Sequence, residues 1–444
     1  MSAAETAVYV TDDTRERGHA YSGATLVRPE DVQSDVPVTP PYLTRSYACY
    51  RALRESAFST AVYLDPADAY CAARARETGT GMATTEVVVD CGKPTLRAVM
   101  RERRSYVSKN VLGRIAAERL ALELADGYVC ADPDVDEWLR ARGWRLPPRA
   151  EERPRGEGRR REVTLPRDPA VSVVVPYHER TDYLSFCLEG LARQTYSPLD
   201  VLVADAGSTS SAARAQLAEV EQRTWPWPLR VVTSAAGGPA VSRNAGWSEA
   251  RGELVTFIDD DDVPFDDMIE RLWRARAVSG ADVAVGGARL FRGEGPPAPH
   301  GDDVVRIPLC DPHELGLISN QYGGPVALWP RTVLDRLQGF TPSAVEDWLL
   351  LARATQHGVR LTAPPDPVHW YRQTSTGRHS ADPVRMRDSG LPQLADVFAE
   401  RLPEDLRLLP LLAAGAYAEL ERRTQPRASR LRSVRSFVRR VARR

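Results

Sequence analysis

The sequence has no uninterrupted apolar run that approaches the length of about 18 residues needed to span a membrane, so no transmembrane helix is predicted. Its N-terminus also lacks the basic-then-apolar order of a signal peptide, and we therefore expect a cytoplasmic protein. Cysteine is scarce, and the six cysteines form no CxxC or Cys/His pattern that would indicate structural zinc or a disulfide framework. They are Cys49, Cys71, Cys91, Cys130, Cys187 and Cys310.

Net charge is nearly absent as well. The formal value is −1, which gives no overall field to attract nucleic acid, and no nucleic-acid partner is expected. At 444 residues the chain exceeds a usual single domain, so we expect two domains and a tail. Because 43% of the residues are hydrophobic and 27% are charged, the composition is that of a soluble protein with real cores.

Residues 1–146 are predicted to form a smaller, Rossmann-like α/β accessory domain. Short β-rich runs at 7–10, 60–65 and 86–90 frame an Ala-rich helical stretch at 66–78, and this alternation is typical of a parallel sheet. The segment 118–144 resembles the N-terminal Rossmann-like domain of GT-B glycosyltransferases. This resemblance implies an α/β fold here, but it does not imply that the domain is active. A charged linker rich in Pro and Gly follows at 147–165.

The most informative stretch is LVTFIDDDDVP, from Leu254 to Pro264. An apolar run that ends at a Pro-containing turn reads as a buried strand. Four carboxylates, Asp259 to Asp262, follow at once, and their mutual repulsion is relieved if a cation or a donor-rich ligand lies among them. Mg²⁺ and Mn²⁺ prefer such oxygen ligands. The alternative at this point is an acidic loop exposed at a strand end.

Two earlier stretches repeat this design, with an apolar strand that ends in polar residues. They are VSVVVPYHER at 171–180 and VLVADAGS at 201–208. A helix pattern follows the first, and a further strand at 229–232 precedes a helix at 239–250. This rhythm predicts an open α/β sheet whose ligand crevice runs along the carboxyl ends of its strands.

The series VSVVVPYHER, VLVADAGSTS, GPAVSRNAG and FIDDDD, followed by Gly339-Phe340 and Glu346-Asp347-Trp348, is similar in order and spacing to the GT-A glycosyltransferases of family 2. The resemblance covers about residues 169–380 and implies a GT-A nucleotide-sugar-binding sheet domain at 166–390. It implies inverting transfer of a sugar from a nucleoside diphosphate sugar to an acceptor hydroxyl, with Mg²⁺ or Mn²⁺ as cofactor.

The same resemblance implies roles for the acidic residues. Asp261 would be the direct metal ligand, Asp259 would support the metal or the donor ribose, and Asp260 would belong to the donor site. Asp347 would be the base that deprotonates the acceptor hydroxyl. A carboxylate that only stabilises a helix N-terminus is the alternative for Asp347.

Recognition of the nucleotide would fall to the ends of the first two strands, at Pro176, Tyr177, Glu179 and Asp205. The second acid of the family pattern is Ala206 here, and this departure leaves the base open. Further along the chain, the resemblance implies two more contributions to the donor site. Arg243 would reach the nucleotide or diphosphate unless it is a surface arginine, and His379 would complete the metal shell from a loop.

Residues 391–444 are predicted to be a helical, Arg-rich tail. From Arg422 to the end there are ten arginines and no acids, and Leu431, Val434, Val438 and Val441 form one apolar stripe among them. A basic amphipathic helix of this kind contacts anionic membrane surfaces, and a solvated end is the alternative.

Two other functions remain open at this stage: a noncatalytic nucleotide-sugar-binding or scaffold protein of the same fold, and a nucleotidyltransferase. The acceptor, whether a glycan, a glycolipid or a small molecule, is not defined by the sequence.

Overall fold

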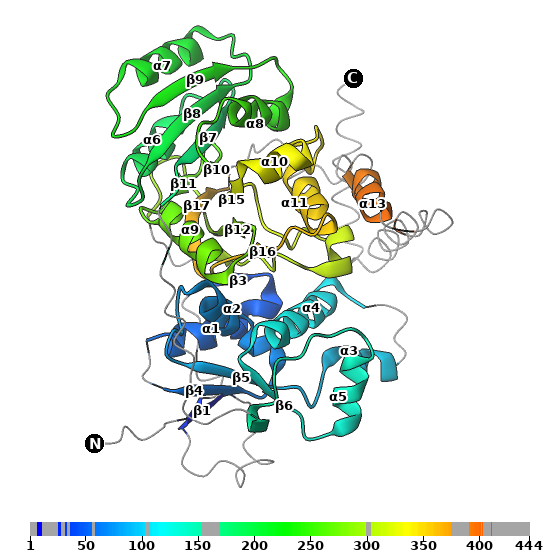
Figure 1. Cartoon of the computed structure of the whole chain (residues 1–444). Helices are drawn as coiled ribbons and strands as arrows, with labels where there is room; N and C mark the ends of the chain where they lie inside the picture. Colours follow the sequence, from blue (N-terminus) through cyan, green and yellow to red (C-terminus); the bar gives the residue numbers. More distant parts are fainter. Residues whose placement is uncertain are drawn as a thin grey trace, which may run out of the picture.

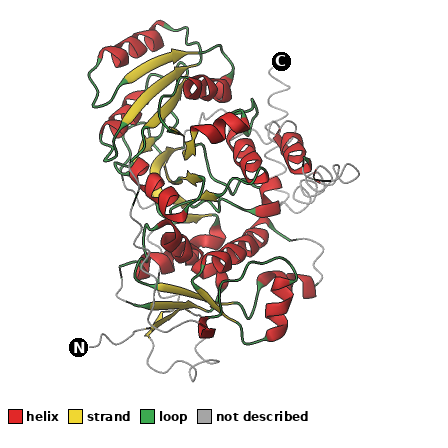
Figure 2. Ribbon diagram, in the orientation of Figure 1, coloured by secondary structure: helices red, strands yellow, loops and turns green. Residues whose placement is uncertain are grey.

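The computed structural model describes residues 7–10, 25–27, 32, 36–55, 58–102, 107–152, 165, 168–298, 303–373, 390–400, 402 and 410. Among these residues the strands form three sheets, and helices pack between and around them (Figures 1 and 2). The α/β class expected from the sequence is therefore confirmed. No helix in the described ranges combines the length and apolarity needed to cross a bilayer.

The N-terminal part contains a five-stranded sheet in the order β2-β1-β4-β5-β6, and all of its neighbouring strands are parallel. Its strands are β1 (Ala7–Val10), β2 (Thr25–Val27), β4 (Thr60–Tyr63), β5 (Glu86–Asp90) and β6 (Gly127–Val129). The helices are α1 (Thr44–Leu53), α2 (Tyr70–Thr78), α3 (Thr95–Arg101), α4 (Lys109–Leu124) and α5 (Pro133–Arg140). The βαβ rhythm read from the sequence thus corresponds to a parallel sheet.

The central part is built on a seven-stranded sheet in the order β16-β12-β15-β10-β7-β8-β9, in which β15 runs antiparallel to both of its neighbours. Its strands are β7 (Val171–Tyr177), β8 (Leu199–Asp205), β9 (Leu229–Thr233), β10 (Leu254–Phe257), β12 (Val283–Val285), β15 (Ala327–Pro330) and β16 (Leu361–Thr362). The helices are α6 (Leu184–Ala192), α7 (Ser211–Gln222), α8 (Gly238–Ser248), α9 (Met268–Ser279), α10 (Arg331–Leu337), α11 (Glu346–Gln356) and α13 (Leu391–Ala399).

Both faces of this sheet are buried, which explains why β7 is apolar almost throughout. Val173 and Val175 pack into the core on the side of α6, α7 and α9, whereas Val174 between them packs into the core on the side of α8 and α11. Helix α8 lies close to β7, because a Cβ at Gly246 would come within 2.3 Å of the Val174 side chain. The glycine therefore sets the distance between this helix and the sheet.

A third sheet, in the order β11-β17-β13-β14-β3, connects the two parts of the chain. Its strands are β3 (Val38–Thr39), β11 (Val263–Pro264), β13 (Gly287–Phe291), β14 (Val304–Arg306) and β17 (Pro367–Arg372). Strand β3 precedes the N-terminal sheet's β4 in sequence, yet it pairs with β14. Val305, Ile307 and Leu309 in turn pack into the N-terminal core. The predicted accessory domain, which ends at 146, and the predicted transferase domain, which begins at 166, thus both contribute to the third sheet and to the N-terminal core.

Helices α1, α2 and α4 lie between the N-terminal sheet and the central part (Figure 1). Asp366, just before β17, receives hydrogen bonds from Tyr47 (3.1 Å) and Tyr50 (2.8 Å) and an ion pair from Arg54 (3.2 Å), all on or next to α1. Its side chain is 17% exposed, so Asp366 is a partly buried polar connection between the two parts.

Candidate active site

The four consecutive carboxylates lie in a tight turn between two sheets. Strand β10 is buried along its length, and Ile258 after it still donates its N–H to the Val174 carbonyl at 3.1 Å. The Asp262 N–H then closes the turn on the Asp259 carbonyl at 3.0 Å, and β11 begins at Val263. The carboxylates therefore follow the carboxyl end of a central parallel strand, where an α/β sheet binds its ligand.

Arg180, three residues after β7, crosses to this turn and contacts two of the carboxylates. Its Nη1 lies 2.5 Å from Oδ2 of Asp261, and its Nη2 contacts Oδ1 of Asp260. Burial raises the pKa of Asp260 to about 8, although the positive charge of Arg180 acts in the opposite direction. The second carboxylate oxygen of Asp260 is buried and has no hydrogen-bond partner.

Arg243 on α8 connects the same turn to helix α11. Its guanidinium pairs with Asp259 at 2.7 Å and with Glu346 at 2.9 Å, and its side chain is only 3% exposed. Glu346 and Asp347 open α11, and the Asp347 carboxylate accepts the N–H of Trp348 at 2.8 Å. Burial, followed by the adjacent charge of Glu346, raises the pKa of Asp347 to about 6, against the opposing effect of Arg243.

Asp262 points to β17. Its Oδ1 accepts the backbone N–H of Arg372 at 3.0 Å, and its Oδ2 lies 3.8 Å from Nε2 of His369. Burial lowers the pKa of His369 to about 4, so this imidazole is neutral near pH 7. The Arg372 guanidinium lies over the ring of Tyr183 at 4.4 Å and donates from Nε to the Asp261 carbonyl at 3.0 Å. These contacts hold the turn on the third sheet.

The ends of β7 and β8 lie side by side, since Pro176 pairs with Ala204 and Tyr177 with Asp205. The Tyr177 hydroxyl donates to Gln216 on α7 at 2.9 Å. Asp205 is buried and accepts both the backbone N–H and the hydroxyl of Ser208, so its carboxylate shapes the loop after β8.

Glu179 has a different environment from the one expected at a nucleotide base. Its backbone is in the left-handed region (φ 60°), and its carboxylate accepts the N–H groups of Thr209 and Ser210 just before α7. Hydrogen bonding from the side chain of Ser210, followed by that from the backbone of Thr209, lowers the pKa of Glu179 to about 2. In this structure the side chain therefore holds the segment that leads into α7, whose N-cap is Ser210.

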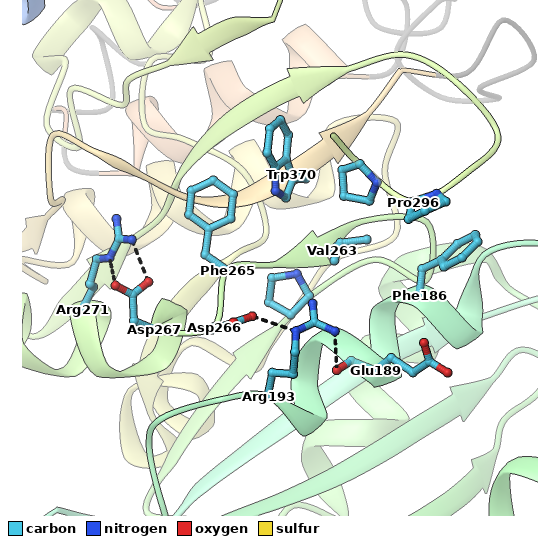
Figure 3. Close-up of a pocket in the computed structure, with 12 residues that line it drawn as sticks. Phe186, Glu189, Arg193, Val263, Phe265, Asp266, Asp267, Arg271, Pro296 and Trp370 are labelled. Atoms are coloured by element: carbon cyan, nitrogen blue, oxygen red, sulfur yellow. Dashed lines mark hydrogen bonds and ion pairs between the residues drawn. The ribbon is translucent and has the colours of Figure 1, made fainter. Parts of the chain in front are cut away.

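A cavity of about 500 Å³ lies next to β11, between α6, the start of α9 and β17 (Figure 3). Phe265 and Trp370 form part of its wall, with ring centroids 5.5 Å apart. Two ion pairs lie in its wall, Arg193 with Asp266 at 3.0 Å and Arg271 with Asp267 at 2.7 Å. Because Trp370 follows His369 on one strand, the two side chains leave β17 on opposite faces. The cavity is therefore separate from the His369 side of the carboxylate turn.

The donor set of the turn fits a hard divalent cation. Asp259 and Asp261 supply carboxylate oxygens from alternate positions, both side chains are partly exposed, and the neighbouring Asp260 keeps an unpartnered oxygen. In the described part of the chain these carboxylates pair with arginines, and no three Asp, Glu, His or Cys side chains converge closely enough to enclose a metal. His379 lies outside the described residues.

The structure thus brings together the regions of Asp259 to Asp261, Arg243 and Asp347, which the sequence had singled out. Sequence reasoning missed the roles of Arg180, Glu346 and Arg372. The strand-end position of Arg180 in PYHER was a usable signal, because a side chain there must meet those of neighbouring strands. Nothing local indicated that Arg372 would contact Asp261 and Asp262.

The α/β sheet with carboxylates at the end of a central strand is the arrangement expected from the resemblance to GT-A glycosyltransferases. Residues 172–327 match the family described as Glycosyl transferase family 2. This match lies within residues 169–380, the region whose motifs resemble the same family.

Similar proteins carry related names. Glycosyltransferase GlyG from Streptococcus pneumoniae serotype 4 is 35% identical over 117 residues, which are 26% of this chain and 38% of that protein. Poly(ribitol-phosphate) beta-glucosyltransferase from Bacillus spizizenii is 29% identical over 218 residues, 47% of this chain and 33% of that protein. The chain thus spans well under half the length of these curated relatives. Among solved structures, S. aureus TarS 1-349 in complex with UDP-GlcNAc has a TM-score of 0.42 and 19% identity, covering 55% of this chain and 71% of that one.

Proposed function

We propose that this protein is an inverting glycosyltransferase that moves a sugar from a nucleoside diphosphate sugar to an acceptor hydroxyl, with a divalent cation. The match of residues 172–327 to the family Glycosyl transferase family 2, and the names of similar proteins, support sugar transfer. One observation carries the finer proposal. A single buried arginine, Arg243, pairs with Asp259 in the strand-end carboxylate turn and with Glu346, the neighbour of Asp347 at the start of α11.

In this proposal Asp259 and Asp261 hold Mg²⁺ or Mn²⁺. When bound, the cation neutralises negative charge that develops on the diphosphate leaving group. Asp347 accepts the proton of the acceptor hydroxyl, and its raised pKa places it near the range in which a base is both ionised and effective. Arg243 acts as a positioning residue, because it holds Asp259 and the start of α11 at a fixed separation.

The donor nucleotide lies along the ends of β7 and β8. Pro176, Tyr177 and Asp205 form the border of this site, and Asp205 keeps the loop after β8 in shape through Ser208. Ala206 cannot accept a hydrogen bond with its side chain, so we leave the base of the nucleotide open. The acceptor is a hydroxyl of a glycan, a glycolipid or a small molecule.

The experiment that tests the proposal is donor hydrolysis by the full chain across a panel of nucleoside diphosphate sugars, with Mn²⁺ and with EDTA. We expect Mn²⁺-dependent hydrolysis of at least one donor. Asp261→Ala should abolish Mn²⁺-dependent binding of the matching nucleoside diphosphate in calorimetry. Asp266→Ala is the matched control, since this aspartate is 59% exposed and lies outside the proposed site. Binding by the Asp261 variant with the affinity of the wild type would refute the assignment.

A noncatalytic nucleotide-sugar-binding protein is the second candidate, and one observation favours it. In this structure Arg180 forms ion pairs with Asp260 and Asp261, and Arg243 forms one with Asp259. Such a protein would bind a donor without hydrolysing it, so the same assay distinguishes the two functions. A nucleotidyltransferase is less well supported, because the segment PYHERTD at the end of β7 is not the basic, Gly-rich loop that a triphosphate needs.

We further propose that residues 1–146 serve as an accessory domain, that 147–165 is the linker, and that 166–390 carries the transferase site. In this scheme the protein is cytoplasmic, and the tail at 391–444 makes a peripheral contact with anionic membrane.

A further inference from the structure

The position of Arg180 is fixed by its neighbours in the sequence. Glu179 adopts φ 60°, a backbone conformation that is uncommon for a residue other than glycine. It is held there by its carboxylate, which accepts backbone N–H groups from Thr209 and Ser210, and by its own N–H, which donates to Ser208 Oγ at 3.1 Å. Strained backbone of this kind persists only where the surroundings enforce it.

This conformation sends two adjacent side chains to different partners. The Glu179 carboxylate lies at the start of α7, and the Arg180 guanidinium lies at the carboxylate turn after β10, about 80 residues further along the chain. One guanidinium thereby contacts two carboxylates: the side chain of Asp260 is 2% exposed and that of Asp261 is 15% exposed. The Arg180 side chain is 44% exposed, so it can leave the turn without disturbing a core.

Two adjacent carboxylates, one buried and one partly buried, need a positive partner, because uncompensated charge in a low-dielectric environment is costly. Arg180 supplies that partner where the proposed cation would bind, since Asp261 is the carboxylate assigned to the metal. Two cations cannot share the same carboxylate oxygens without strong mutual repulsion.

We propose that Arg180 is the counter-ion of the cation site in the metal-free protein and competes with the divalent cation for Asp261. Glu179 is the positioning residue that holds Arg180 in place. The inference rests on the proposed function, because it presupposes that a cation binds at this turn. It predicts that the protein without nucleotide binds Mn²⁺ weakly, and that weakening the two-carboxylate contact of Arg180 tightens Mn²⁺ binding.

The test is a titration of Mn²⁺ into the full chain without nucleotide, followed by electron paramagnetic resonance of the free ion. We expect Arg180→Gln to bind Mn²⁺ about tenfold more tightly than the wild type, which corresponds to about 1.4 kcal/mol. Arg193→Gln is the matched control and should bind Mn²⁺ as the wild type does. That arginine is also exposed (53%) and paired with one aspartate, Asp266, away from the turn.

Arg180→Lys separates competition from simple charge removal. Lysine keeps the positive charge but offers a single point of contact in place of the planar fork. If the guanidinium competes through its two carboxylate contacts, the Mn²⁺ affinity of Arg180→Lys should lie between those of the wild type and Arg180→Gln. If only the positive charge matters, Arg180→Lys should bind Mn²⁺ as the wild type does. The lysine variant also keeps the test available if Arg180→Gln does not fold.

The outcomes distinguish this inference from the proposed function. Unchanged or weaker Mn²⁺ binding in both Arg180 variants, with wild-type binding that Asp261→Ala abolishes, overturns the role of Arg180 and leaves the cation site standing. Absence of Mn²⁺ binding from the wild type and both variants overturns the cation site and the inference together.

Discussion

Replacing Glu346 by Gln should shift the acidic limb of the pH–rate profile to lower pH. Two contributions act in the same direction. The substitution removes the negative charge that, after burial, contributes most to raising the pKa of Asp347. It also removes one of the two ion pairs of Arg243, and a guanidinium with a single remaining partner favours the ionised form of the nearby Asp347 more strongly.

The magnitude follows from the position of the pKa. With a pKa of about 6, roughly half of Asp347 is ionised at pH 6 and about a tenth at pH 5. Since only the carboxylate can accept a proton, the rate in the wild type should rise with pH through this range. Loss of a like charge next to a carboxyl lowers its pKa by about one unit or more, so the limb of the variant should lie near pH 5.

The assay is the initial rate of donor hydrolysis between pH 4.5 and about 8 at saturating donor and Mn²⁺, a range set to cover both expected limbs. Glu249→Gln is the control, since Glu249 is an exposed acid at the end of α8 and should leave the profile unchanged. A Glu346→Gln profile that coincides with that of the wild type, or that moves to higher pH, would show that Asp347 is not the titrating base.

Three further predictions follow from the same structure. Asp347→Asn should keep the affinity for nucleoside diphosphate and Mn²⁺ in calorimetry but lower turnover by about 100-fold or more, and near-normal turnover would place the base elsewhere. Asp366→Ala should lower the melting temperature by several degrees, because the loss of three partly buried hydrogen bonds costs about 2–3 kcal/mol. Asp335→Ala, at an exposed aspartate, is the control. Equal melting temperatures of the wild type and Asp366→Ala would contradict a stabilising contact between the two parts. Deletion of residues 427–444 should leave donor hydrolysis intact and weaken cosedimentation with anionic vesicles, most clearly at low salt. The reason is that each arginine near such a surface contributes about 1 kcal/mol to binding. Equal cosedimentation of the full-length and shortened proteins would indicate a solvated end.

Much of the local architecture could be predicted because it depends on periodicity. The apolar runs at 171–177, 201–205 and 254–257 were read as strands, and β7, β8 and β10 occupy those positions. Their polar ends could then be expected to meet at one edge, since parallel neighbours end on the same side of a sheet. The carboxylate turn and Asp205 follow from that rule. Assignment of roles to Asp261 and Asp347 required the family resemblance, because a strand-end or helix-start acid has a structural use as well.

The sequence by itself determined the α/β class, the positions of the central strands and the edge at which a site would form, since these depend on residues close together in the chain. Only the tertiary structure decided which charges meet. Arg180 lies about 80 residues from its carboxylates and Arg243 about 100 from Glu346. Strand β3 pairs with β14 across a much longer stretch of sequence, with Val38 opposite Val305. Ion pairs and strand pairs of this range leave no periodic signal, because each contact depends on how separate elements pack and not on the local order of residues.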